Sequence, residues 1–164
     1  MKFDQIDCRT VKIIIVGPRT PQNEFLCSEI TKEMGIVCLI RDGGLISVFE
    51  YGLPGKDESG GKKLILIDTE NPNFEEILED ISTNRSLSGC YISLLNLKED
   101  SGLEKKALTR NIRGFFYKDD QFEVYLKGIR AILSGDLWIS RSVFLKCVFD
   151  TFKDNRKAVG GKRS

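Results

Sequence analysis

Five short apolar segments recur along the 164-residue chain and constrain its fold more than any other feature. Four contain many β-branched residues and the fifth is aromatic; they span residues 12–16, 36–40, 64–67, 91–95 and 114–117. Within each segment the apolar residues follow one another and do not alternate with polar ones. This continuity is typical of strands that are buried on both faces, as in a parallel sheet.

Segments with helical periodicity lie between these predicted strands. Thr20 and Pro21 are suited to the start of the first helix, and Gly35 to its end. Apolar residues recur with a helical period after Asn73, near Leu103 and after Asp120. Strands that alternate with helices predict βαβ units and a parallel sheet. The Gly-rich stretch 42–63 is the exception, and we expect its helix to be short or disordered.

A further helix is predicted from residue 141 to about residue 152, after the fifth strand and helix. Apolar residues cover most of its circumference, whereas a surface helix needs only one apolar stripe to dock. The surplus predicts a second buried contact, most simply with another copy of the chain. The expected homodimer interface includes Val143, Phe144, Cys147 and Val148.

Composition excludes several classes of function. Histidine is absent, which removes Ser-His and Cys-His catalysis and most transition-metal sites. The 25 basic and 24 acidic residues nearly cancel, so the chain has no general attraction for nucleic acid or anionic membranes. Its five cysteines lack Cys-x-x-Cys spacing, as is typical of reduced cytoplasmic proteins, and no apolar segment is long enough to span a membrane. We expect a cytoplasmic protein that is not an enzyme and needs no metal.

The order of strands and helices over residues 11–152 resembles the receiver domain of bacterial response regulators. The resemblance implies a flavodoxin-like, CheY-like (βα)5 α/β fold with sheet order 2-1-3-4-5, here with an additional sixth helix. Receivers of this family have an acidic pair after the first strand, a phosphoacceptor aspartate after the third, a hydroxyl residue after the fourth and a lysine after the fifth. The carboxylates hold Mg²⁺, and the lysine and hydroxyl contact the phosphoryl group.

This chain matches that pattern only in part. Asp68 stands at the phosphoacceptor position, Lys118 at the lysine position and Asn96 at the hydroxyl position. The acidic pair is missing, because the first strand is followed by Gly17, Pro18 and Arg19. A single carboxylate is a poor Mg²⁺ site. We therefore favour a structural Asp68–Lys118 ion pair over a working phosphoacceptor, and do not expect control by phosphorylation.

Four residues at the start of the last helix, Trp138, Ile139, Ser140 and Arg141, have the chemistry that a guanine nucleotide requires. A guanidinium can bind a phosphate or the edge of guanine bidentately. Ser140 is suited to the N-cap of a helix whose N–H groups attract anions, and Trp138 offers an aromatic surface. Alternatively, Trp138 fills a gap between helices, Ser140 is only a cap and Arg141 is solvated.

These four residues, with the segment 111–133, resemble the VpsT/CsgD-like biofilm regulators of the LuxR type. Their receivers lack the acidic pair and have a sixth helix. Members that bind cyclic di-GMP have Trp, then Phe, Leu or Met, then Thr or Ser, then Arg, from which Ile139 is a conservative departure. The resemblance implies a dimeric signal-transduction domain that binds cyclic di-GMP at Trp138–Arg141.

The alternatives are a receiver that only dimerises or contacts a partner protein, a conventional two-component receiver that is phosphorylated, and, more distantly, a flavodoxin-like enzyme. The enzyme is disfavoured because Gly17-Pro18 is not a phosphate-binding loop. We assign residues 1–152 to the regulatory domain and 153–164 to a basic flexible linker or tail. The resemblance also implies a C-terminal helix-turn-helix domain for DNA, which we expect to be absent from this chain.

Overall fold

Five parallel strands form a single sheet in the order β2-β1-β3-β4-β5, which confirms the predicted receiver topology. The computed structural model describes residues 11–44, 62–83, 87 and 89–160, the last four as backbone only. The strands are β1 (Lys12–Val16), β2 (Val37–Arg41), β3 (Lys63–Asp68), β4 (Cys90–Leu97) and β5 (Gly114–Tyr117). Most of the stretch in which we expected the short second helix, residues 45–61, lies outside the described residues.

The two faces of the sheet are covered by different helices. Helices α1 (Pro21–Met34) and α5 (Phe122–Leu133) pack on the face that contains Ile13 and Leu66. Helices α3 (Phe74–Thr83) and α4 (Leu103–Leu108) pack on the face that contains Ile14 and Ile67. Because successive side chains of a strand point to opposite faces, the continuous apolar sequence of the central strands supplies both cores.

The predicted limits of α1 are confirmed by its hydrogen bonds. The Thr20 Oγ1 accepts a hydrogen bond from the Asn23 N–H at 3.1 Å, and Gly35 ends the helix with a φ of 66°. An L-residue with a side chain rarely adopts that conformation, whereas glycine does so at little cost. This cap brings the first turn of α1 to the carboxyl end of β1, where the candidate site lies.

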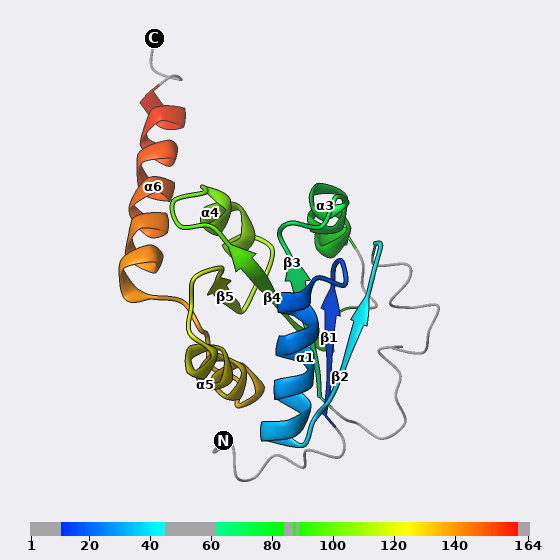
Figure 1. Ribbon diagram of the computed structural model, residues 1–164. Coiled ribbons are helices and arrows are strands. Elements are labelled where there is room, and N and C mark those ends of the chain that lie inside the picture. The colour runs from blue at the N-terminus through cyan, green and yellow to red at the C-terminus, as the bar shows by residue number, and fades with distance from the viewer. Residues whose placement is uncertain (1–10, 45–61, 84–86, 88, 161–164) are drawn as a thin grey trace.

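The last helix, α6 (Arg141–Gly160), is longer than predicted. It passes the expected end at residue 152, so residues 153–160 of the predicted flexible tail are helical; residues 161–164 lie outside the described part. Figure 1 shows α6 beside α4, with its C-terminal half extending beyond the rest of the domain. An ion pair between Lys105 on α4 and Asp154 on α6 joins the two helices.

Four cysteines lie in the described part of the chain. Cys27, Cys38, Cys90 and Cys147 are free thiols that are buried or half-buried. None of the helices in the described part of the chain is long and apolar enough to cross a bilayer.

Candidate functional site

Asp68, at the end of β3, is fully buried and hydrogen-bonded through both carboxylate oxygens. Its Oδ1 accepts from the Glu70 N–H at 2.9 Å, and its Oδ2 accepts from the Asn23 amide at 2.8 Å. Asn23 is also fully buried, and its Nδ2 donates to the Pro18 carbonyl oxygen at 2.9 Å. A neutral amide from α1 therefore contacts the carboxylate of Asp68.

Asn96 extends this network from β4. Its Nδ2 donates to the Asn23 Oδ1 at 3.3 Å, while its own Oδ1 is buried without a hydrogen-bond partner in the described part of the chain. The backbone of Asn96 has a φ of 58°, a conformation that asparagine tolerates better than most residues. The three predicted phosphorylation-site residues are thus only partly brought together: Asp68 and Asn96 meet through Asn23, which sequence reasoning missed. The position of Asn23 in the capped first turn of α1 was the sequence feature that could have indicated this contact.

The predicted Asp68–Lys118 ion pair is wrong. Lys118 donates instead to the Glu70 Oε1 at 2.5 Å, and this hydrogen bond raises the pKa of Lys118 above its usual value. The oxygens of Asp68 are occupied by N–H donors of α1 and of the turn after β3, so the exposed lysine pairs with the partly exposed carboxylate nearby. The short segment after β3 decides this pairing.

Crowding around Asp68 also explains the glycine after β1. A Cβ atom at Gly17 would lie 2.6 Å from the Cβ of Asp68, closer than real Cβ contacts come. The loop after β1 therefore has no room for a carboxylate at that position. Within the described ranges, no group of three histidine, cysteine, aspartate or glutamate residues could hold a metal ion.

The backbone of Trp138 forms a short parallel bridge to β5. Its N–H donates to the Arg113 carbonyl oxygen at 2.9 Å, and its carbonyl accepts from the Phe115 N–H at 3.0 Å. The half-buried indole packs against the core on the α5 side. A Cβ at Gly128 of α5 would lie 2.8 Å from the indole Cδ1 and 2.4 Å from the Phe116 ring. Trp138 thus packs against α5 of its own subunit, with part of its surface exposed.

Valine in place of Gly128 is expected to displace the indole and to lower the free energy of unfolding by about 1–3 kcal/mol, the usual cost of overpacking a filled core. Urea denaturation followed by the fluorescence of Trp138, the single tryptophan, measures both effects. Gly89→Val is the matched control, because a Cβ at Gly89 meets no atom of the described residues within 4 Å. Equal stabilities of the two variants would contradict this packing.

Ser140 and Arg141 begin α6 as predicted. The Ser140 Oγ accepts from the Val143 N–H at 3.2 Å, which makes Ser140 the N-cap. Arg141 is exposed, and no carboxylate among the described residues forms an ion pair with it. Ile139 is half-buried and packs with Val143 against the core on the α3–α4 side. The four residues 138–141, here called the tetrad, thus have different roles: two apolar residues pack on the core, Ser140 caps α6, and the guanidinium of Arg141 is exposed.

A groove of about 460 Å³ lies beside the tetrad, between β5 and α5. Phe115, Tyr117, Val124 and Trp138 form apolar and aromatic walls, Asp120 borders the groove, and Ser140 lies at the end near α6. The size falls in the range of small-molecule sites, about 300–1,000 Å³. A planar aromatic ring fits this lining chemically.

The apolar residues of α6 divide between two sides. Cys147 is buried and Val143 half-buried against their own subunit, although we had predicted both for a dimer interface. Phe144 and Val148 line an open groove of about 420 Å³ between α4 and α6. Phe149 and Phe152 are each 61% exposed, and sequence reasoning did not select them because it could not orient the helix.

Comparisons with known proteins agree with the observed fold. A family model described as the VpsT-like receiver domain matches residues 24–141. The regulatory domain of the master biofilm regulator CsgD has a TM-score of 0.63 and 15% identity, covering 84% of this chain and 98% of that one. A LuxR-family DNA-binding response regulator from Silicibacter pomeroyi has a TM-score of 0.60 and 17% identity, covering 81% and 98%.

The isolated receiver domain of RcsB from Salmonella enterica serovar Typhimurium is also similar, with a TM-score of 0.61 and 14% identity over 80% of this chain and 94% of that one. At such identities, the structural matches establish the fold alone. No curated protein sequence matches the chain.

Proposed function

Since the chain belongs to the VpsT-like receiver-domain family, a family of regulatory domains and not of enzymes, we propose that it binds cyclic di-GMP at Trp138–Arg141 as a dimer. One observation carries the proposal: the guanidinium of Arg141 stands exposed at the capped start of α6, without an ion-pair partner in the described part of the chain. Such a guanidinium binds a phosphate bidentately, and the first N–H groups of the helix add attraction for an anion.

The surroundings suit the rest of the nucleotide. The groove between β5 and α5 offers aromatic and apolar walls to a guanine base, and Trp138 lines it with the exposed part of its indole. Base–aromatic stacking contributes about 1–3 kcal/mol per base. Phosphate and base are thus assigned to neighbouring parts of one surface, with Ser140 between them.

A dimer would complete the site. Cyclic di-GMP has two-fold symmetry, and a symmetric dimer presents the same residues from each subunit. Phe149 and Phe152 leave apolar surface exposed on α6, which supports this helix as the contact between subunits. Phe144 and Val148 remain predicted interface residues, and Phe149 and Phe152 join them in this proposal.

Sedimentation velocity with and without cyclic di-GMP tests the proposed function. We expect the nucleotide to shift the chain toward dimer, and Phe149→Lys to oppose that shift because it places a charge in the apolar contact. Lys32→Ala, a change at an exposed position of α1 away from the proposed contact, is the control. A dimer whose association constant does not respond to nucleotide would instead favour the alternative, a receiver used only for dimerisation or partner contact.

Asp68 is not expected to accept a phosphoryl group. It is fully buried, both oxygens are hydrogen-bonded, and Mg²⁺ requires several clustered oxygens. Incubation with acetyl phosphate and Mg²⁺ should leave the intact mass of the protein unchanged. A phosphoryl adduct that disappears in Asp68→Asn would contradict the proposal of a degenerate phosphorylation site.

We further propose that the chain is the regulatory half of a LuxR-type transcription regulator of the cytoplasm. CsgD is a master biofilm regulator, and the Silicibacter pomeroyi protein binds DNA. By analogy, DNA contact would be made by a helix-turn-helix domain and not by the receiver residues; the chain has a net charge of only +1.

A further inference from the structure

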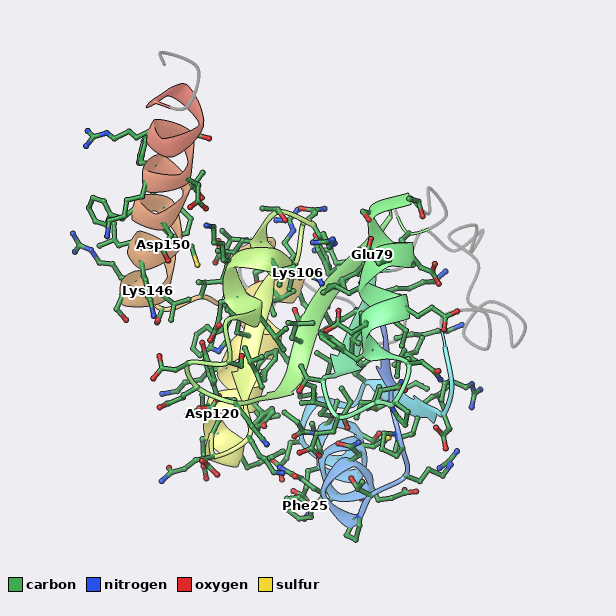
Figure 2. All side chains as sticks on the ribbon, turned by 90° about the horizontal axis from the view of Figure 1, so that it is seen from above. Phe25, Glu79, Lys106, Asp120, Lys146 and Asp150 are labelled. Carbon is green, nitrogen blue, oxygen red and sulfur yellow. The ribbon has the colours of Figure 1, made fainter. Side chains whose placement is uncertain are left out.

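A second pocket, of about 160 Å³, lies between α1 and α5 near the carboxyl ends of the strands. It is distinct from the groove between β5 and α5 that we assign to cyclic di-GMP, here called the nucleotide groove, although Asp120 borders both. Figure 2 shows Phe25 and Asp120 at the edge of the molecule that is remote from the C-terminal half of α6. The volume exceeds the roughly 30 Å³ that one water occupies in the liquid, so a small organic ligand fits.

Three aromatic rings line this pocket. Phe25 and Phe122 meet edge to face with ring centroids 5.9 Å apart. Tyr125 is fixed on its other side, because its ring stacks on Phe116 at 5.3 Å and its hydroxyl donates to the Tyr117 carbonyl oxygen at 2.8 Å. Phe25 is 57% exposed, so part of this ring is accessible from solvent.

A buried acceptor lacks a partner at this pocket. Asn96 lines it and is only 2% exposed. Even so, the Asn96 Oδ1 has no hydrogen bond within the described residues. Its amide cannot simply turn around, because the Nδ2 donates to Asn23, whose own amide is held by Asp68. An unsatisfied buried acceptor costs about 1–3 kcal/mol, so a ligand that donates an N–H would relieve it.

The charges around the pocket favour a cation. Among the residues that the structure describes, no lysine or arginine lines it, whereas Asp120 does. Burial first, and then the carboxylates of Asp120, Asp68 and Asp119, raise the pKa of Tyr125 above its usual value. The nearby Lys118 is engaged with Glu70. Aromatic faces beside a carboxylate are the surroundings in which ammonium groups bind.

We propose that this pocket binds a small primary alkylammonium ion. The ammonium group donates to the Asn96 Oδ1, its charge is balanced by Asp120, and its alkyl part contacts Phe25, Phe122 and Tyr125. An anion in this pocket would find no lysine or arginine among the described lining residues, and a metal ion would lack clustered oxygen ligands. The inference does not depend on cyclic di-GMP, because none of the residues 138–141 lines this pocket.

A titration of the full chain with ethylammonium chloride, followed by ¹H–¹⁵N NMR, tests this assignment. We expect saturable shifts confined to the Asn96 side-chain amide and the start of α5. Ethanol, a neutral molecule of similar shape, and sodium chloride at equal ionic strength should not reproduce them. Equal shifts with ethanol or sodium, or shifts that never saturate, would overturn the proposal.

Two matched variants sharpen the test. Asp120→Asn keeps an oxygen to accept from the Tyr117 N–H, which Asp120 now does at 2.8 Å, but removes the charge. It should weaken ethylammonium binding at least about five-fold, the effect of one charge near the protein surface. Glu123→Gln, the same change at an exposed position of α5, should leave the affinity unchanged. Equal affinity of the Asp120 variant and the wild type would refute the site.

Discussion

Alanine at Arg141 is expected to lower the affinity for cyclic di-GMP at least about 30-fold, because losing one partner of a hydrogen-bonded charge pair costs about 2–5 kcal/mol. The reason is local: Arg141 is the exposed cation at the start of α6, and Ser140 beside it is already used as the cap. A phosphate would lose both hydrogen bonds of the guanidinium fork. Fluorescence of Trp138 provides the binding signal.

The controls separate loss of contact from loss of fold. Arg156→Ala removes the same side chain from an exposed position farther along α6 and should not change the affinity. Arg141→Lys keeps the charge but not the planar fork, so we expect an intermediate loss. Circular dichroism and the melting temperature should be those of the wild type. An affinity unchanged by Arg141→Ala would show that the phosphate binds elsewhere.

Alanine at Phe116 is expected to produce the largest loss of stability, about 3–5 kcal/mol, which is the usual cost of removing a buried aromatic ring. Phe116 is fully buried in β5 and stacks on Tyr125 with an interplanar angle of 10°. Its ring also lies close to Gly128, beside the position where Trp138 packs. The cavity would therefore loosen both α5 and the start of the nucleotide groove.

The same change at an exposed phenylalanine is the natural comparison. Phe25→Ala, with a side chain that is 57% exposed, should lower the free energy of unfolding by less than about 1 kcal/mol. Urea denaturation measures both variants under one set of conditions. Losses of equal size would contradict the assignment of Phe116 to the core that joins β5 to α5.

The fold was predictable because its strongest signals are local and repeated. Continuous apolar segments such as β3, whose residues are all buried, indicate a parallel sheet without knowledge of the neighbours. The edge strand β2 departs from this pattern, since Val37 and Leu39 are exposed. Its own residues do not indicate that it lies at the edge of the sheet. The end of α6 was also misplaced, since no glycine or proline between residues 152 and 159 stops the helix.

The site was less predictable because long-range packing decides its contacts. Asn23 and Asp68 are 45 positions apart in the sequence, and no short motif predicts their contact. Lys118 pairs with Glu70 instead of Asp68 because the turn after β3 brings the glutamate within reach. The backbone bridge of Trp138 to β5 was missed for a similar reason, as isolated bridges leave no pattern in the sequence. The N-cap at Ser140, a local feature, was predicted correctly.

Isothermal titration calorimetry of the unmodified chain with cyclic di-GMP tests the central claim most directly. The proposal predicts a saturable heat at micromolar nucleotide, with a stoichiometry that fits a symmetric dimer, and little heat with GMP, which lacks the second half. Absence of heat from a folded, dimeric sample would contradict nucleotide binding and leave a receiver whose role is confined to protein contacts.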